Sequence, residues 1–135
     1  MNEGSDMRIQ LFIAFGLAIA VPSSAQAPRP PGSTRIDLQR HDLGIEGREV
    51  LQARVDFAPG AYFPRHTHPG EEIIYVLSGS IEYEIAGKLA TVKAGDVLFV
   101  PDGVVHAARN VGGTPASELA TYVLEKGKPL STFVK

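Results

Sequence analysis

Short apolar segments separated by glycine and proline constrain the fold of this chain more than any other feature. Residues 49–57 read EVLQARVDF, in which Leu51, Ala53, Val55 and Phe57 alternate with polar side chains, and Pro59-Gly60 follows. Such alternation is typical of a β-strand with one buried face. Further candidate strands, with turn residues between them, lie at 62–68, 73–77, 80–86, 89–93, 97–100, 104–110 and 119–124. Short strands at regular spacing predict an all-β sandwich or barrel.

Two of these segments depart from simple alternation. Residues 62–68 contain Pro64, which cannot donate a hydrogen bond to a neighbouring strand, so we expect an edge strand or a bulge there. Residues 73–77 read IIYVL, a continuous apolar run that is typical of a strand buried on both faces. One face would pack in the core. A second copy of the chain is the expected cover for the other face, which predicts a homodimer.

Composition excludes several classes of site and partner. The 135 residues include 14 glycines, 10 prolines and no cysteine, and 13 basic against 15 acidic side chains leave a net charge of −2. Without cysteine there are no disulfides, cysteine-ligated metals or cysteine nucleophiles. A balanced charge offers no basic surface for nucleic acid, so a nucleic-acid partner is not expected.

The first 27 residues have the pattern of a cleaved signal peptide. Residues 9–21 read IQLFIAFGLAIAV and contain only one polar side chain, Gln10. This run is too short to cross a bilayer comfortably but suits the core of a signal peptide. Ala25-Gln26-Ala27 supplies the small residues that favour cleavage after Ala27. A membrane anchor or a buried N-terminal helix is the alternative reading.

The predicted cleavage divides the chain into three parts. We expect a signal peptide at 1–27, a proline-rich linker at 28–34 and one folded domain at 35–135, located in the periplasm or secreted, with no stable membrane insertion after cleavage. Glu3 and Asp6 are unusual ahead of a signal core, whereas a start at Met7 leaves Arg8 alone before it. Translation from Met1 or from Met7 therefore stays open.

Three of the four histidines lie in two short clusters. His66 and His68 are two residues apart on a candidate strand, so both side chains point to one face. The turn at 69–70 brings the chain back and allows Glu72 to face the same point, and His106 follows another turn at 101–103. Three imidazoles and a carboxylate that converge inside a barrel form a divalent metal site with open coordination positions. The fourth histidine, His41, is expected on the surface or in a loop.

The spacing of these residues resembles the two sequence motifs of the cupin family. The first motif consists of Gly, five residues, His-x-His, three or four residues, Glu, six residues and Gly. The second consists of Gly, five residues, Pro-x-Gly, two residues, His, three residues and Asn. The matching positions in this chain are Gly60, His66, His68, Glu72 and Gly79, followed by Gly95, Pro101, Gly103, His106 and Asn110.

This resemblance implies a fold and a ligand set. The fold is all-β, the double-stranded β-helix or jelly-roll barrel of small single-domain cupins. The implied ligands of one divalent ion are His66, His68, Glu72 and His106, and the ion would be iron, manganese or nickel, with zinc as a further candidate. Glu71 is the rival to Glu72, and the motif spacing favours Glu72. The sequence around residues 66–79 is also similar to small exported cupins called quercetin-dioxygenase-like.

Strand alternation suggests which side chains line a substrate pocket. If His66 and His68 point inward, Tyr62 lies on the same face, although core packing is an equal alternative for this side chain. If Glu72 points inward, Ile74 and Val76 share its face. We expect Tyr62, Ile74 and Val76 to contact a small organic ligand near the metal.

Three kinds of function stay open at this point. The resemblance favours a metal-dependent oxygenase of the quercetin-dioxygenase-like type, with Glu72 also available as a catalytic base. The same ion could instead support a non-redox isomerase or lyase that acts on a sugar-like substrate. A non-catalytic module that binds or senses a small molecule is the third candidate, because no further His, Lys or Cys is expected in the pocket.

Overall fold

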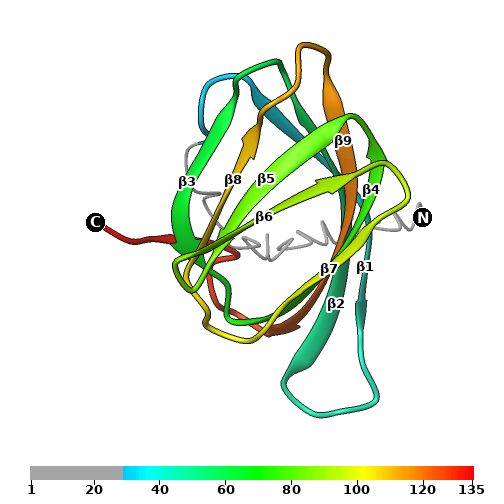
Figure 1. The fold of residues 1–135 in the computed structure, drawn as a ribbon. Coiled ribbons are helices and arrows are strands. Elements are labelled where there is room, and N and C mark those ends of the chain that lie inside the picture. The colour runs from blue at the N-terminus through cyan, green and yellow to red at the C-terminus, as the bar shows by residue number, and fades with distance from the viewer. Residues whose placement is uncertain (1–28) are drawn as a thin grey trace, which may run out of the picture.

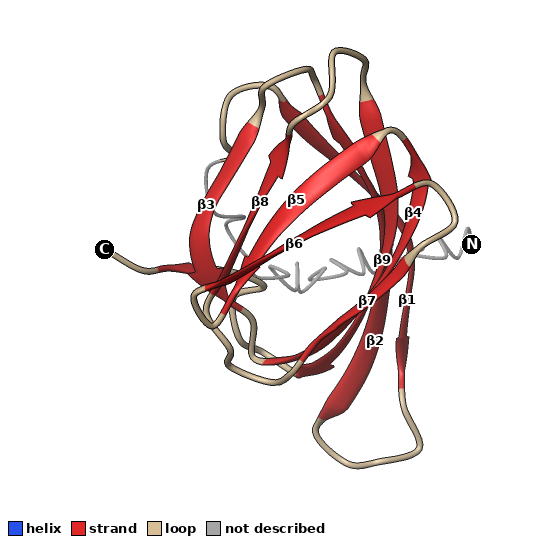
Figure 2. Cartoon of the chain, in the orientation of Figure 1, coloured by secondary structure: helices blue, strands red, loops and turns tan. Residues whose placement is uncertain are grey.

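The computed structural model describes residues 29–135, and all regular elements in this part of the chain are β-strands (Figure 1, Figure 2). The predicted signal peptide lies outside the described residues. No helix that could span a membrane occurs within 29–135. The strands are β1 (Ser33–Asp42), β2 (Arg48–Phe57), β3 (Tyr62–Thr67), β4 (Gly70–Ser78), β5 (Ser80–Ile85), β6 (Lys88–Lys93), β7 (Val97–Val100), β8 (His106–Asn110), β9 (Ala116–Glu125) and β10 (Thr132–Phe133).

The strands form two five-stranded antiparallel sheets that face each other. One sheet has the order β1-β2-β9-β4-β7 and the other the order β10-β3-β8-β5-β6. Figure 1 shows the two layers wrapped around a common interior, with β3, β8, β5 and β6 in the nearer layer. This arrangement confirms the expected jelly-roll barrel, and each of the eight predicted strand segments corresponds to one of β2 to β9.

The core lies between the sheets and follows the alternation seen in the sequence. On β2, Leu51, Ala53, Val55 and Phe57 are buried, and their neighbours face outward. On β4 the buried side chains are those of even-numbered residues, whereas Ile73, Tyr75 and Leu77 are 44–46% exposed. Within one chain the IIYVL segment is therefore buried on one face only, and its outer face is an apolar surface.

Two strands were not predicted. β1 begins at Ser33, inside the predicted linker 28–34, and pairs with β2 over its whole length. Its sequence, STRIDLQRHD, is mostly polar because β1 is an edge strand with largely exposed side chains, His41 among them. β10 has only two residues and pairs with β3 at Thr67 and His66. Neither strand has the apolar alternation or the apolar run by which strands such as β2, β4 and β5 were predicted.

The start of β4 requires glycine. Gly70 has φ 149° and pairs with Leu124 of β9. A Cβ atom at this position would lie 1.9 Å from the carbonyl oxygen of Val123, far inside van der Waals contact. The close approach of β4 to β9 therefore depends on the absence of a side chain. Since Gly70 lies between His68 and Glu72, the same approach also positions those two side chains.

Gly70→Ala should destabilise the protein much more than Gly87→Ala. Both glycines have positive φ, but a Cβ at Gly87 would meet no atom within 4 Å, so that variant carries only the backbone cost of about 1–2 kcal/mol. At Gly70 the clash with backbone adds to it, and we expect a loss of at least about 4 kcal/mol or failure to fold. Urea unfolding of both variants measures the difference, and equal losses would show that β9 yields freely at this contact.

Candidate metal centre

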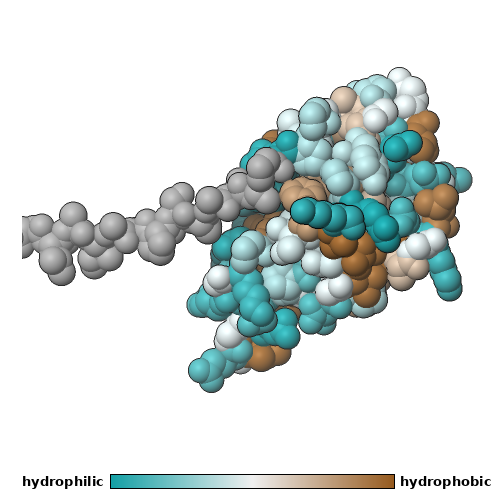
Figure 3. Space-filling view, turned by 90° about the vertical axis from the view of Figure 1, so that its left-hand side faces the viewer, coloured by the Kyte–Doolittle hydropathy of each residue, from teal (hydrophilic) through white to brown (hydrophobic). Residues whose placement is uncertain are grey.

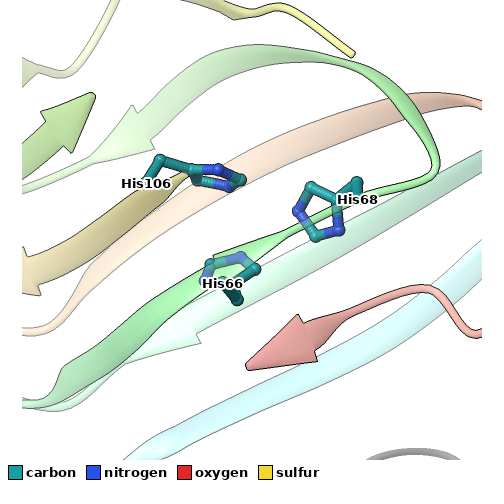
Figure 4. Close-up of side chains that lie close together, drawn as sticks. All are labelled: His66, His68 and His106. Carbon is teal, nitrogen blue, oxygen red and sulfur yellow. The ribbon is translucent and has the colours of Figure 1, made fainter. Parts of the chain in front are cut away.

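Four buried polar side chains meet inside the barrel. His66 lies on β3, His68 directly after it, Glu72 on β4 and His106 at the first position of β8. His66 and His106 are direct cross-strand partners. Each of the four residues is only 2–5% exposed. The three histidines can bring ligand nitrogens within 4.8 Å of one another, and Figure 4 shows their rings gathered around one point.

Backbone carbonyls determine the tautomer of each ring. Nδ1 of His66 lies 2.7 Å from the carbonyl oxygen of Pro64, and Nδ1 of His106 lies 2.9 Å from that of Val104. Nδ1 of His68 lies 2.6 Å from the carbonyl oxygen of Leu130, which comes from the segment after β9. A carbonyl only accepts, so each Nδ1 carries the proton and donates it. In the neutral ring Nε2 is then left with a free lone pair.

No protein group donates a hydrogen bond to the Nε2 lone pairs of His68 and His106. Nε2 of His68 and Nε2 of His106 are buried without a hydrogen-bond partner. They lie 3.3 Å and 3.2 Å from the same carboxylate oxygen, Oε2 of Glu72. A lone pair that faces a carboxylate oxygen is repulsive, whereas a cation between them would bind both. Ligands at about 2.1 Å from a common ion lie about 3 Å apart when they are adjacent, so this donor set fits a divalent metal ion.

The electrostatics of the cluster suit a cation as well. Burial, together with the neighbouring His106 and His68, lowers the pKa of His66 to about 3, so the ring stays neutral. Burial alone would raise the pKa of Glu72. A proton on Nε2 of His106 and His68 reverses this effect, because hydrogen bonds from these rings to the carboxylate then hold that pKa below its usual range, and a cation bound in the same place would act in the same direction. Neutral imidazole and ionised carboxylate are the forms that bind metal.

The structure places Glu72, and not Glu71, beside the histidines. β4 alternates, so Glu72 faces the barrel interior while Glu71 is only partly buried and faces the other way. Glu71 is paired with Val123 of β9, on the outer side of the sheet. The choice that the motif spacing favoured therefore agrees with the direction of the strand.

Tyr62 does not share the face of His66, because β3 has a bulge. The register with β8 shifts between Phe63 and His66, so β3 uses one more residue than β8 over this stretch. A bulge reverses the alternation. It leaves Tyr62 39% exposed beside Arg109, whose guanidinium lies 4.8 Å from the centre of the tyrosine ring. Phe63 faces the cluster instead, with its ring centre 4.6 Å from that of His66.

Ile74 and Val76 face inward on β4 as predicted from Glu72, but they do not reach the cavity. Both are fully buried in the core. The predicted inward direction of these two side chains was correct, but they lie too far along β4 to line the cavity. Neither side chain is among the residues that line the space around the histidines.

The four polar side chains border a cavity of about 570 Å³. Apolar lining comes from residues of both sheets, including Val55, Phe57 and Phe63. The cavity reaches the surface beside β1 and the segment after β9, where Arg40, Lys126 and Lys128 line it with half-exposed side chains. The segment after β9 also holds His68 through the Leu130 carbonyl, so it forms both a wall of the cavity and a support of the site.

Sequence reasoning did not place Tyr83, Glu118 and Tyr122 in this cavity, where all three are buried. The Tyr83 hydroxyl donates a hydrogen bond to Glu118. Burial and the negative charge of Glu72 raise the pKa of Glu118 to about 8. One signal was present in the sequence. Glu118 precedes a predicted strand by one residue, and it shares the parity of Tyr122 on that strand.

Comparison with known proteins identifies the chain's relatives. Residues 53–122 match the family model described as a cupin domain. The chain is 42% identical over 85 residues to germin-like protein subfamily 2 member 2 of Arabidopsis thaliana, covering 58% of this chain and 39% of that protein. The chain spans about half or less of the length of the curated relatives that it matches.

Two solved structures extend the comparison beyond the matched segment. An oxalate oxidase structure superimposes with a TM-score of 0.62 at 30% identity, over 86% of this chain and 63% of that chain. The polyketide cyclase RemF from Streptomyces resistomycificus superimposes with a TM-score of 0.62 at 25% identity, over 80% of this chain and 76% of that chain.

Replacement of the proposed ligands should abolish metal binding, whereas replacement of the adjacent carboxylate should not. We expect His106→Ala and Glu72→Gln to weaken Mn²⁺ or Zn²⁺ binding by more than about 100-fold, since each loses a direct ligand, and Glu71→Gln to bind like the unaltered protein. Titration calorimetry measures the affinity. Metal loss in Glu71→Gln with retention in Glu72→Gln would reverse the assignment.

Removal of the metal should also lower the stability of the protein. Metal at a hundredfold excess over Kd adds about 2.7 kcal/mol of stability, so chelation should lower the melting temperature by about 10 °C or more.

Proposed function

The chain belongs to the cupin family, and from that premise we propose that it is a metal-dependent oxygenase acting on a small organic molecule. The observation that carries this proposal is the orphaned pair of imidazole nitrogens on His68 and His106, which face the Glu72 carboxylate at the wall of a ligand-sized cavity. His66, His68, Glu72 and His106 are the proposed ligands. Four protein ligands on a six-coordinate ion leave two positions for other molecules.

The surrounding residues suit an organic ligand. When bound, an iron, manganese or nickel ion would supply a Lewis acid and the capacity to activate dioxygen. Val55, Phe57 and Phe63 give the cavity an apolar wall that holds a carbon skeleton and excludes water. Glu72 is the proposed proton acceptor when it releases the ion, because its carboxylate is buried at the wall of this space.

The relatives support oxygen chemistry but do not transfer a substrate. A 30% identical solved structure is that of an oxalate oxidase. The polyketide cyclase, at a similar TM-score, shows that a comparable barrel also occurs in a protein named for a different reaction. The substrate must therefore be found by experiment. For the location of the protein we propose export, on the basis of the apolar run at 9–21 and the Ala25-Gln26-Ala27 pattern.

Dioxygen consumption is the test of the proposed function. Protein purified from its own host should contain iron, manganese or nickel, and should consume dioxygen with one of a panel of phenols, 1,3-diketones and uronates. The metal-depleted protein and Glu72→Gln should lose at least about 100-fold in rate, because the site loses its ion or its base. Turnover of a panel compound without dioxygen would instead identify an isomerase or lyase. Full metal occupancy with no turnover of any panel compound would favour a binding protein.

We further propose that two copies of the chain associate through the outer face of β4 and β7. Ile73, Tyr75, Leu77, Val97 and Phe99 lie there on adjacent strands, are 44–70% exposed, and carry no charge. The face on the β3 side, by contrast, is mixed, with hydrophilic residues around small apolar areas (Figure 3). A second copy is the occupant that the surface favours, since a two-fold axis would place the same aromatic and aliphatic side chains against each other, as in the cores of dimer interfaces.

The protein should therefore be a dimer at micromolar concentration, and Tyr75→Lys or Phe99→Lys should make it a monomer. Each substitution places two charges in the interface, one from each copy, because the contact is symmetric. Leu89→Lys is the matched control, since Leu89 is 68% exposed on β6 of the other sheet and should leave the dimer intact. Sedimentation analysis measures the mass. A monomeric unaltered protein would contradict the proposal.

A further inference from the structure

Glu118 is a buried carboxyl group in the cavity that has no role in the metal centre and, unlike Glu49, no basic partner. Glu118, on β9, is 3% exposed. The Tyr83 hydroxyl donates a hydrogen bond to one of its oxygens, Oε2. The pKa of Glu118 is affected by its burial, by the charge of Glu72 and by the hydrogen bond from Tyr83, but by no basic side chain. Glutamate is rarely buried to this degree without a cation, because removal of the charge from water is costly.

Packing alone does not explain a carboxyl group at this position. Its cross-strand partners on the same face are Val55 of β2 and Val76 of β4, and the next inward residue on β9 is Ala120. A leucine would continue this apolar surface at lower cost, with a phenylalanine in place of Tyr83. The carboxyl group instead lines the cavity that also contains the histidines and Glu72.

The register of the sheet places Glu118 and the metal centre at separate positions along one wall. Tyr122 is the partner of Glu72, and Val76 is the partner of Glu118, four residues further along β4. Val55, the other partner of Glu118, and Phe57 line the cavity near this position. A molecule held at the histidines can thus extend over an apolar surface toward Glu118.

We propose that Glu118 is a specificity-determining residue whose carboxyl group hydrogen-bonds an oxygen at the end of the ligand remote from the histidines and Glu72. This inference rests on the proposed function, because the metal centre is taken to hold the other end of the ligand. The ligand class follows from the three parts of the cavity. It has a metal-binding oxygen group at one end, an aromatic or otherwise apolar body, and a hydroxyl or carbonyl group at the far end.

The protonation of Glu118 agrees with this role. Burial, and then the negative charge of Glu72, raise the pKa of Glu118 to about 8 in the metal-free protein, so the group carries its proton at pH 7. Burial, the larger cause, also acts when an ion is bound to Glu72. A neutral carboxyl group both donates and accepts hydrogen bonds, which allows it to bind a hydroxyl or a carbonyl.

Two probes of similar shape test the contact, 4-hydroxybenzoate and 4-methylbenzoate. Both carry a carboxylate for the metal centre and differ only in the hydroxyl or methyl group at the opposite end. Calorimetry on the metal-loaded full chain gives the ratio of their dissociation constants for each variant. Glu118→Leu should shift this ratio toward the methyl probe by about tenfold, because one buried hydrogen bond is lost and the ligand hydroxyl is left unsatisfied.

Three further variants separate a ligand contact from a structural role. Glu118→Gln keeps a donor and an acceptor, so its ratio should stay within about threefold of the unaltered protein. Tyr83→Phe removes the internal partner of Glu118 but not the ligand contact, so it should keep the preference. Glu46→Gln changes an exposed carboxylate in the β1–β2 turn and should alter nothing. If Glu118→Leu folds poorly, the double variant with Tyr83→Phe removes the orphaned hydroxyl and gives the same readout.

The outcomes distinguish this inference from the proposed function. Metal-dependent binding of both probes, with one ratio for the unaltered protein and Glu118→Leu, would overturn the role of Glu118 and leave the metal centre intact. Binding that is the same with and without metal would overturn the proposed function, and with it the inference. If binding depends on metal, and the ratio of the two dissociation constants changes only when residue 118 cannot form a hydrogen bond, the proposed function and the role of Glu118 are both supported.

Discussion

The hydrogen bonds from three histidine Nδ1 atoms to backbone carbonyls are the interactions on which the site depends. Each bond leaves an unprotonated Nε2, and at His68 and His106 this atom is buried without a partner. Two of the acceptors, the carbonyls of Pro64 and Val104, lie two residues from their histidines, so these two hydrogen bonds depend only on the local conformation of the chain. The third acceptor, Leu130, lies 62 residues from His68, so this ring is oriented only when the segment after β9 has folded back.

The jelly-roll topology brings these parts together. Antiparallel pairing of β3 with β8 places His66 opposite His106, and the turn into β4 places Glu72 next to both His68 and His106. The start of β4 lies close to β9 because Gly70 has no side chain against Val123. One sheet therefore provides His66 and His106, the other provides the Glu72 carboxylate, and His68 lies in the connection between them. The donor set forms only when the two sheets close on each other, which couples the site to the stability of the barrel.

Two carboxyl groups in one cavity have opposite protonation for identifiable reasons. Both are buried, and burial alone would raise both pKa values. Glu72 faces two imidazole rings, and a proton or a metal ion held between them and the carboxylate keeps Glu72 ionised, whereas Glu118 has no such neighbours and lies within the field of the Glu72 charge. Environments that separate the pKa values of neighbouring acids commonly mark functional sites. The cavity between the two carboxyl groups has an apolar lining and can hold the apolar part of a ligand.

The amino-acid sequence by itself determined the fold class, eight of the strands and the grouping of the three histidines with Glu72. Alternation and turn residues are local signals, and the shared face of His66 and His68 follows from short-range geometry, whereas only the motif spacing favoured Glu72 over Glu71. Only the tertiary structure decided the rest of the cavity. The bulge in β3 moved Tyr62 outward and Phe63 inward, and Pro64 indicated the bulge without showing its effect on alternation. For Ile74 and Val76 the inward direction was predicted correctly, but both lie in the hydrophobic core and not at the cavity. Whether an inward side chain reaches a cavity depends on how the opposite sheet packs, which the local pattern does not show. Glu118, Tyr83 and the Leu130 carbonyl come from strands and segments far apart in the chain, and their roles arise from long-range packing that local patterns do not encode.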